Sequence, residues 1–283
     1  MELPLLAVSL VAELTPRLRT SEPPQLLHPA FSSPTLIDDP LLFGILPPRH
    51  LLPNRWSLGS ADICFTTPLK TAFFSSGHVL PTYRLHRSPS LGGLWQPTLH
   101  LLPRLLDKGE WVHIFPEGRI QQHPLHQMRY FKWGVARGIL EAEQHPVVVA
   151  IWLQGLEEVM GEDRGWPRWL PRGGKRVRIV VGAPNEEGWE DLRGRWKELV
   201  KKEEGRGVRV TGDLGSWELR QGEEAKALRV EATRRVREMV LELRRGEGWP
   251  EEEQGAGTPE YYQTPGMREK EGLLADGARV KDT

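Results

Sequence analysis

The sequence predicts an α/β fold in which helices pack on a central, mostly parallel sheet. Short runs rich in β-branched and aromatic residues alternate with longer helical segments through the middle of the chain. One of the helical segments gathers its leucines largely on one side, as a helix packed on a sheet does. A chain of 283 residues has room for one domain of about 200 residues plus tails.

Four segments are expected as strands, because each is short and rich in β-branched or aromatic residues. They are Ala61 to Thr66, Trp111 to Phe115, Val147 to Trp152 and Arg176 to Val181. Helices are expected between them, at Leu94 to Asp107 and at Arg129 to Glu143. Lys108 and Gly109 supply the stop signal for the first of these helices.

Beyond Pro184 the sequence changes to long, charged helical segments, at Trp189 to Glu204 and Gly222 to Arg245. Arg, Lys and Glu alternate along both, which predicts faces laced with ion pairs. A thin apolar stripe favours a solvated helix docked on the core over a dedicated membrane or partner helix; it comprises Ala225, Leu228, Val236, Val240 and Leu243. The tail 246–283, rich in Glu, Gly and Pro, is expected to be disordered.

Composition excludes several classes of protein. The formal net charge is zero, so no overall field favours nucleic acid. Cys64 is the single cysteine, which excludes an intramolecular disulfide framework and a Cys-rich zinc site. With no basic residue beside it in the sequence, Cys64 is expected to be a buried structural thiol and not a nucleophile. The nine histidines show no paired ligand spacing, so neither a metal nor a cofactor is expected.

Membrane association is expected to be peripheral. No segment reaches the roughly 18 consecutive apolar residues that a spanning helix needs, and the apolar run Leu3 to Val11 is too short. That run lacks the basic flank of a secretory signal, and Glu2 and Glu13 are atypical of a mitochondrial presequence. Trp166 and Trp169, bracketed by arginines, are candidates for an interfacial anchor, with core packing as the alternative.

The run from Trp111 to Arg119 reads Trp-Val-His-Ile-Phe-Pro-Glu-Gly-Arg and carries the main candidate site. Pro116 stops the strand, and Gly118 lets the backbone approach a ligand. Glu117 offers an acceptor and Arg119 a planar, multidentate donor, which suits a substrate that carries a phosphate. An ordinary turn after a buried strand would explain the same four residues from Phe115 to Gly118.

The blocks around this run decide between the two interpretations, because they follow one another in a fixed order. They are Asp38-Asp-Pro40 with Phe43-Gly44, Ala61 to Thr66, Phe73 to Gly77, Trp111 to Arg119, Arg129 to Gly134 and Trp152 to Gly155. In these blocks the chain resembles the tafazzin branch of the glycerolipid acyltransferases, over roughly Asp38 to Gly182. The resemblance implies a single glycerolipid-acyltransferase-like domain that transfers an acyl group to a lysophospholipid.

The chain departs from this family at its catalytic motif. The family carries H-x-x-x-x-D, in which the histidine takes a proton from the attacking hydroxyl and the carboxylate orients the imidazole. Asp38 matches the carboxylate, but Ser33 stands where the histidine belongs. Serine is no general base near neutral pH without a partner to activate it. His28, ten positions before Asp38, could substitute only if the loop folded back.

The resemblance also implies roles for other residues. Phe115, Pro116, Glu117, Gly118 and Arg119 would position the glycerophosphate. Arg84 is the candidate for holding the lipid phosphate, with Arg87 a weaker choice, because a guanidinium makes two charge-assisted bonds to one phosphate. Arg129 and Lys132 would face lipid headgroups or simply solvate a helix.

The function implied by the resemblance is CoA-independent transacylation between phospholipid and lysophospholipid, which remodels the acyl chains of cardiolipin. The expected partners are those lipids, and the implied address is the intermembrane-space side of mitochondrial membranes. A CoA-dependent lysophosphatidate acyltransferase is one alternative. A non-catalytic lipid-binding pseudoenzyme is the other, and Ser33 is the residue that keeps it open.

Three regions are expected along the chain. Residues 1–37 do not resemble the family, and their density of proline, serine and leucine predicts an irregular segment or a reading frame joined at the wrong splice site. Residues 38–245 form the acyltransferase-like domain with its C-terminal helices. Residues 246–283 form the tail.

Overall fold

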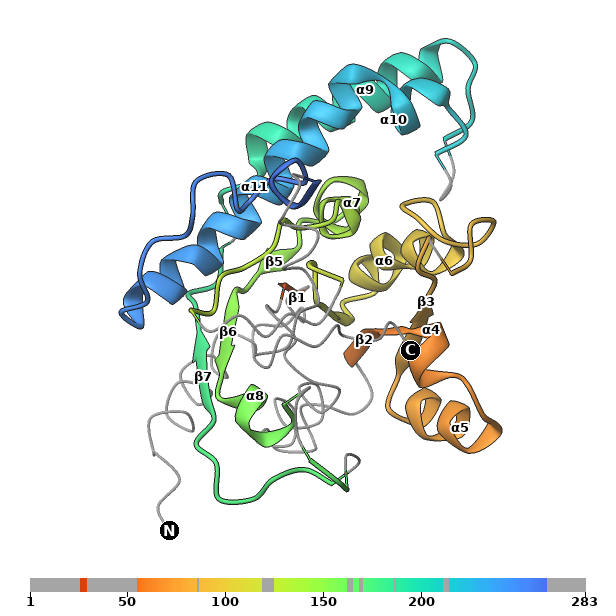
Figure 1. Cartoon of the computed structure of the whole chain (residues 1–283). Coiled ribbons are helices and arrows are strands. Elements are labelled where there is room, and N and C mark those ends of the chain that lie inside the picture. Colours follow the sequence, from red (N-terminus) through yellow and green to blue (C-terminus); the bar gives the residue numbers. More distant parts are fainter. Residues whose placement is uncertain are drawn as a thin grey trace.

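The computed structural model describes residues 26–29, 55–85, 87–118, 125–161, 165–167, 170–185, 187–210 and 214–263. These residues form two β-sheets with helices around them (Figure 1). The α/β class predicted from the sequence is confirmed.

The larger sheet has five strands in the order β3-β2-β4-β1-β5, and each neighbouring pair runs parallel. Its strands are β1 (Leu26–Pro29), β2 (Arg55–Ser60), β3 (Val79–Thr82), β4 (Trp111–Ile114) and β5 (Val147–Val148). β4 lies between β2 and β1, with His113 in register with Ser57 on one side and with His28 on the other. The predicted strand at Trp111 to Phe115 is therefore the central strand of the sheet.

The prediction of a strand at Ala61 to Thr66 is wrong. Ala61–Cys64 forms the short helix α4, and the strand is the preceding segment Arg55–Ser60. Ser60 precedes the helix, and its hydroxyl donates to the Asp62 carboxylate at 2.6 Å. A serine followed by an aspartate in the first turn favours a helix start, and this outweighs the apolar run that follows.

The smaller sheet pairs β6 (Ile151–Gln154) with β7 (Arg178–Val181) in antiparallel fashion. The single strand expected at Val147 to Trp152 is therefore two strands in different sheets. The chain leaves the large sheet after Val148 and enters the small sheet at Ile151. The strand expected at Arg176 to Val181 is confirmed from Arg178 onward.

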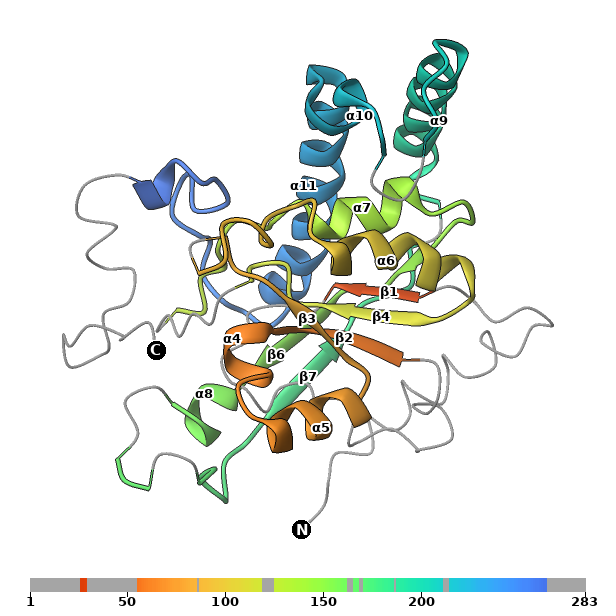
Figure 2. The ribbon, with the colours of Figure 1, turned by 90° about the vertical axis from the view of Figure 1, so that its right-hand side faces the viewer.

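Helices cover both faces of the large sheet. α6 (Pro97–Asp107) and α7 (Gly134–Glu141) lie together on one side, and α5 (Pro68–Ser76) lies on the other (Figure 2). The apolar side of α6 is buried through Leu99, Leu102 and Leu106, whereas Leu101 is exposed. α7 begins five residues later than the expected helix at Arg129, because residues 129–132 form neither helix nor strand and Trp133 is a turn residue that precedes the helix.

Four further helices complete the described chain: α8 (Leu156–Val159), α9 (Glu190–Gly205), α10 (Trp217–Gln221) and α11 (Glu223–Gly246). The apolar stripe predicted on α11 is buried at Ala225, Leu228, Val236 and Val240, and Leu243 is partly buried against the same core. α11 contacts α7, α9 and β6. The prediction of solvated helices docked on the core is confirmed.

Trp95 joins these C-terminal helices to the loop that follows β3. Three guanidinium carbons lie close to the centroid of its ring: Arg137 of α7 at 4.8 Å, Arg220 of α10 at 5.0 Å and Arg229 of α11 at 4.9 Å. Arg137 also donates to the Leu94 carbonyl at 3.1 Å. One aromatic side chain therefore contacts arginines from three helices.

The chain after α11 departs from the expected disordered tail. Residues 247–263, which we call the C-terminal strap, lie against the core and end in a short 3₁₀ helix, Tyr261–Gln263. Ala256 and Tyr262 of the strap are buried. The rest of the expected tail, residues 264–283, lies outside the described residues.

Among the described helices, none combines the length and the apolar character needed to cross a bilayer.

Cys64 is buried at the end of α4. Its Sγ lies 3.2 Å from the position that a Cβ on Gly59 would take. The expected buried thiol is confirmed, although a helix holds it and not a strand.

Candidate active site at the carboxyl edge of the sheet

The carboxyl ends of the parallel strands meet at one edge of the large sheet, where α/β proteins bind ligands. Along this edge Thr82 ends β3, Ser60 ends β2, Ile114 ends β4 and Pro29 ends β1. Neighbouring strands lie about 4.8 Å apart, so chain segments that leave these four strands start within roughly 15 Å of one another. Most of the site residues expected from the sequence follow these ends.

The chain turns sharply after β4. The Gly118 N–H donates to the Phe115 carbonyl at 3.0 Å, which closes a turn around Pro116 and Glu117. Gly118 has φ +60°, a left-handed conformation that glycine adopts without a steric cost. Pro116 and Glu117 are buried, whereas Gly118 is exposed. The turn therefore presents its backbone at Gly118, and the Glu117 carboxylate points into the protein.

Phe115 fastens this turn to the smaller sheet. It packs against the apolar cluster of Ile151, Leu153 and Leu156. The fully buried His113 ring meets the Phe115 ring edge-on, with centroids 4.7 Å apart. Phe115 therefore has a packing role in the described structure, and its expected contact with substrate stays a prediction.

Arg84 lies just beyond β3 and binds Asp62 of α4. The Arg84 Nε donates to Asp62 Oδ1 at 3.1 Å, and the Arg84 Nη2 donates to Oδ2. Burial alone would raise the pKa of Asp62, but the hydrogen bonds from Arg84 and Ser60 outweigh it and lower the pKa to about 2. Arg87 lies farther from the same carboxylate, at 4.0 Å. The structure brings Arg84 to the expected edge, where Asp62 fixes its orientation.

The block from Arg129 to Gly134 runs beside the turn. The Lys132 N–H donates to the Pro116 carbonyl at 2.8 Å, and Lys132 Nζ donates to the Gly118 carbonyl at 3.3 Å. Lys132 is exposed, so its ammonium lies at the accessible face of the turn. Arg129 is buried, with its guanidinium over the rings of Tyr130 and Tyr262. Of the two candidates for headgroup contact, the geometry favours Lys132.

Two arginines of α11 hold the backbone of residues 125–129, which leads into this block. Arg244 donates to the carbonyls of Leu125 and His126, each at 3.0 Å. About two turns earlier in the helix, Arg237 donates to the carbonyls of Met128 and Arg129, also at 3.0 Å. Because a guanidinium carries several donors in a fixed plane, each arginine fixes two successive peptide groups.

The C-terminal strap completes the support. Glu252 accepts from the Met128 N–H at 2.7 Å and from Arg237 at 2.5 Å. The Tyr262 hydroxyl donates to the Met128 carbonyl at 3.3 Å. Burial raises the pKa of Tyr262 to about 12, and the nearby negative charge of Glu117 adds to this effect. The buried Glu117 carboxylate is therefore close enough to the strap to interact with Tyr262.

Ser33, Asp38 and Arg119 lie outside the described residues, so the geometry around the catalytic motif stays a prediction. His28 lies within β1, paired in the ladder with His113, and not in the segment that follows the strand. The chain leaves β1 at Pro29, opposite Ile114, and Ser33 and Asp38 follow within nine residues. That exit lies directly beside the turn after β4.

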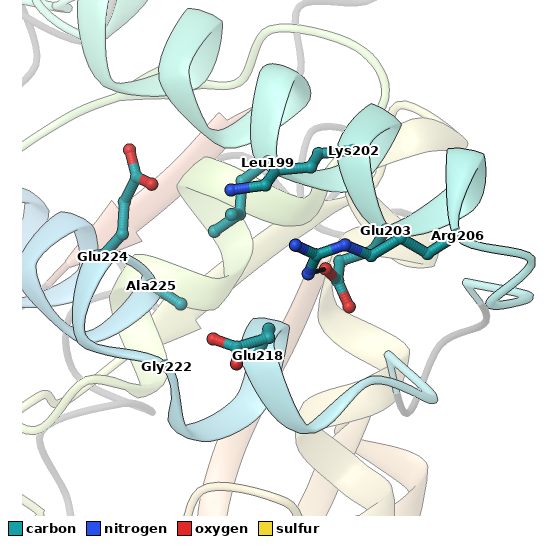
Figure 3. A pocket seen from close by; sticks show the side chains of 8 residues that line it. All are labelled: Leu199, Lys202, Glu203, Arg206, Glu218, Gly222, Glu224 and Ala225. Atoms are coloured by element: carbon teal, nitrogen blue, oxygen red, sulfur yellow. Dashed lines mark hydrogen bonds and ion pairs between the residues drawn. The ribbon is translucent and has the colours of Figure 1, made fainter.

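The structure also contains a polar hollow away from this edge, between α9, α10 and α11 (Figure 3). It has a volume of about 180 Å³, and charged side chains surround it, among them Lys202, Arg206 and Glu218. Glu203 in its wall accepts from Ser216 at 2.5 Å and from Arg206 at 2.7 Å. These contacts join α9 to α10, and none of the site residues expected from the sequence lines the hollow.

Sequence reasoning missed Asp62 and the residues of the strap. Asp62 belongs to the block Ala61 to Thr66, but a strand was expected there, and the pairing with Arg84 spans 22 residues. Glu252 and Tyr262 lie in a region whose composition predicted disorder. The available signal was three aromatic residues, Trp249, Tyr261 and Tyr262, in a tail otherwise rich in Glu, Gly and Pro.

Comparison with known proteins agrees with this geometry. The sequence profile of the Acyltransferase family matches residues 22–154, a range that starts before Asp38 and includes every strand of the large sheet. A protein named Tafazzin from Saccharomyces cerevisiae is 34% identical over 246 residues, which cover 74% of this chain and 64% of that protein.

Two further relatives are similar over about half of the chain. A Taffazin from Dictyostelium discoideum is 40% identical over 153 residues, 52% of this chain and 50% of the relative. An N-acylphosphatidylethanolamine synthase from Arabidopsis thaliana is 33% identical over 157 residues, 53% of this chain and 52% of the relative. The chain thus spans less than two thirds of the length of each of these relatives.

A parallel sheet flanked by helices, with the Phe-Pro-Glu-Gly turn at its carboxyl edge and the profile match across it, defines the class: residues 22–154 of the chain form an Acyltransferase domain. Within that class it is a relative of the tafazzins, as the order of its motifs predicted.

Proposed function

We propose that this protein is a CoA-independent phospholipid–lysophospholipid transacylase of the 1-acylglycerophosphocholine O-acyltransferase type, acting on the acyl chains of cardiolipin. The observation that carries the proposal is the turn after β4. Gly118 exposes its backbone at the carboxyl edge, and Lys132 lies beside it. β1 lies next to β4, and Asp38 follows β1 nine residues later in the sequence. The similarity to tafazzins supports the choice of lipid.

The proposed reaction exchanges one ester for another. The free hydroxyl of a lysophospholipid attacks the carbonyl carbon of a donor acyl ester, and a base takes its proton. The tetrahedral intermediate then releases the donor's glycerol oxygen, which takes the proton back, so that a new lysophospholipid leaves. A histidine oriented by Asp38 performs the proton transfers in the motif that the chain resembles. In this sequence Ser33 stands at the histidine's position.

The remaining residues would hold the glycerophosphate. Arg119 follows the turn directly and is the proposed donor to the phosphate. Lys132 adds a positive charge on the accessible side of the turn. Arg84 is proposed to act from the end of β3, two strands away from β4 in the sheet, in an orientation that its bond to Asp62 fixes in advance.

The test is acyl exchange between labelled lysophosphatidylcholine and cardiolipin without added CoA. We expect weak exchange by the native chain and an increase of about 100-fold or more in Ser33→His, because a positioned general base contributes that much. Ser32→His places the same imidazole one residue away and serves as the matched control. Adding Asp38→Asn to Ser33→His should remove the gain. If Ser33→His exchanges acyl groups no faster than Ser32→His, the proposed mechanism is wrong.

Acyl-CoA distinguishes the other enzymatic alternative. A CoA-dependent lysophosphatidate acyltransferase would transfer label from acyl-CoA to lysophosphatidate and would show no exchange between phospholipids. Strict dependence of Ser33→His on acyl-CoA would therefore select that activity in place of transacylation.

Ser33 itself favours a second candidate function, a lipid-binding protein without catalysis. This candidate predicts that the native chain binds phospholipid vesicles and that Arg119→Ala weakens the binding. It also predicts that no donor gives acyl transfer, in the native chain or in Ser33→His. Exchange by Ser33→His would show that the site retains everything except the base.

The proposed location follows from the tafazzin resemblance, which implies mitochondrial membranes and their intermembrane-space side, with peripheral attachment. Alkaline carbonate extraction of mitochondria that contain the tagged chain tests the attachment. Protease protection with and without rupture of the outer membrane tests the side. A peripheral protein appears in the carbonate supernatant, and one in the intermembrane space is cleaved only after rupture.

A further inference from the structure

The helix α5 directs its apolar side chains outward. Leu69 and Phe73, four residues apart on one side of the helix, are 81% and 64% exposed. No residue of α5 is buried, and Phe74 alone in the helix is partly covered, against Phe65 with ring centroids 6.3 Å apart. A helix on the surface of a globular protein normally turns its apolar face to the core. α5 does the opposite.

The helix is nevertheless well formed. Thr67 caps its start by accepting from the Lys70 N–H at 3.3 Å, and Pro68 occupies the first turn. At its end the Gly77 N–H donates to the Phe73 carbonyl at 3.3 Å. The apolar ridge of Leu69 and Phe73 is therefore held on a defined helix.

Two further large apolar side chains, Leu85 and Leu91, are exposed in the loop after β3. The whole stretch 55–92 is positively charged within a chain of zero net charge. It contains the basic side chains Arg55, Lys70, Arg84 and Arg87 and a single acidic one, Asp62, which Arg84 already pairs. Exposed apolar side chains with basic side chains among them are complementary to a lipid bilayer, whose interior is apolar and whose surface is anionic.

The position of the patch agrees with this match. α4 and α5 follow the carboxyl end of β2, and Leu85 follows Arg84 beyond the end of β3. Both views place α5 at the end of the molecule away from α9 and α10 (Figures 1 and 2). The patch therefore adjoins the edge of the sheet that carries the candidate site.

From these observations we propose that α5, together with Leu85, Arg87 and Leu91, docks on an anionic phospholipid surface, with Leu69 and Phe73 inserted among the acyl chains and Lys70 and Arg87 at the phosphates. This places the carboxyl edge against the bilayer, so that a phospholipid reaches the Gly118 turn without leaving the membrane. The inference rests on the proposed function only for the choice of lipid as partner, since docking requires no acyl transfer.

Vesicle flotation tests the docking surface, with vesicles of phosphatidylcholine alone and of phosphatidylcholine with cardiolipin. We expect Leu69→Ser combined with Phe73→Ser to lower the partition coefficient at least about tenfold on both vesicles, because two exposed apolar side chains lose their burial in lipid. Lys70→Gln should lower it about fivefold on the anionic vesicles and leave binding to phosphatidylcholine unchanged. The matched control is Trp217→Ser on α10, a 67% exposed side chain at the other end of the molecule.

Three outcomes would overturn the proposal. Unchanged binding by the double variant would exclude insertion of α5. A dimer in the native protein that the double variant abolishes, seen by light scattering, would assign the patch to a second copy of the chain. A large fall in melting temperature with unchanged vesicle binding would assign it to another segment of the chain itself.

A probe on α5 covers the case in which the double variant does not fold. Phe73→Cys can carry an environment-sensitive fluorophore, because Cys64 is buried. We expect its emission to increase and shift to the blue on adding anionic vesicles, and an unchanged spectrum on vesicles that bind the protein would contradict insertion. Acyl exchange measured on the same samples separates the docking proposal from the proposed function. Vesicle binding can be measured without acyl transfer, and acyl transfer can be measured when vesicle binding is weakened.

Discussion

Gly118 is the residue at which the turn after β4 is most sensitive to substitution. Its φ of +60° is costly for any side chain, and a Cβ would come within 2.7 Å of Lys132 Nζ. Because the lysine end can move, the backbone conformation dominates the cost. We expect Gly118→Ala to lower the free energy of unfolding by roughly 1 to 2 kcal/mol, as measured by urea denaturation.

Gly194 in the middle of α9 provides the matched control. Nothing lies within 4 Å of a Cβ added there, and its backbone is helical. Gly194→Ala should raise the free energy of unfolding by about 0.5 to 1 kcal/mol. Equal effects of the two substitutions would contradict the conformational explanation.

The ion pair of Arg84 and Asp62 should make stability depend on pH. The folded protein holds the Asp62 pKa at about 2, below its ordinary value of 3.8. The pair therefore contributes fully above the unfolded pKa, and its contribution is lost as the pH falls through the folded pKa. We expect Arg84→Gln to lower the free energy of unfolding near neutral pH by about 1 kcal/mol, after allowance for solvent screening. The difference from the native protein should shrink as the pH falls from 3.8 to about 2.

Denaturant unfolding at several pH values measures this difference, and Arg87→Gln is its control. Arg87 lies 4.0 Å from the same carboxylate and is more exposed than Arg84, so we expect a change of less than about 0.5 kcal/mol. A difference for Arg84→Gln that stays constant down to pH 2 would show that Asp62 does not titrate through this pair.

At the scale of secondary-structure elements, α11 supports the site through its arginines. Arg244 is buried, and its guanidinium donates to three carbonyls, those of Leu125, His126 and Pro250. A lysine ammonium is a compact charge that cannot reproduce this planar arrangement. We expect Arg244→Lys to lower the free energy of unfolding by roughly 3 kcal/mol, since three carbonyls lose a donor that is itself buried.

The next residue of α11 is the control. Arg245 pairs with Glu238 and Glu251 on the exposed side. Arg245→Lys should leave the melting temperature almost unchanged, because exposed ion pairs contribute little. If both substitutions lowered the melting temperature equally, the special role of the Arg244 carbonyl contacts would be refuted.

Local pattern predicted some elements and failed at others for identifiable reasons. β4 was predictable because Trp111, Val112 and Ile114 favour a strand and Pro116 ends it. β2 was not, because Ser57, Gly59 and Ser60 give it a weak strand signal, while the neighbouring Ile63-Cys64-Phe65 run gives a stronger one in a helix. The break between β5 and β6 lies within one continuous apolar run, so only tertiary structure separates them.

The same distinction applies to the site. The Phe-Pro-Glu-Gly turn is a local feature, and its conformation follows from Pro116 and Gly118. The support behind it is not local, because Met128 and Glu252 are 124 residues apart in sequence. No periodicity or spacing relates such residues, and the strap has the composition of a disordered tail. The turn that presents the site was therefore predictable from the sequence, and the residues that support it from behind were not.

At the scale of the whole molecule, Trp95 joins the α/β core to the C-terminal helices. Arg137, Arg220 and Arg229 lie around the Trp95 ring. Burial lowers the pKa of Arg229 to about 10, so this guanidinium stays charged at neutral pH. We expect Trp95→Leu to lower the free energy of unfolding by roughly 2 to 3 kcal/mol, because the ring loses three cation–π contacts. Trp166→Leu changes a side chain that is 88% exposed and should stay within about 0.5 kcal/mol of the native protein. Thermal or denaturant unfolding that ranks the two variants the other way would contradict this role of Trp95.

The C-terminal strap has a consequence for the synthesis of the protein. A ribosome makes β4 and the Gly118 turn long before it reaches Glu252 and Tyr262, and it adds only about 5 to 20 residues per second. During that interval the backbone of Met128 has none of the partners that the strap and α11 later supply. Contacts this distant in sequence also form slowly. We therefore expect the candidate active site to be completed among the last steps of folding, after the sheet on which it stands.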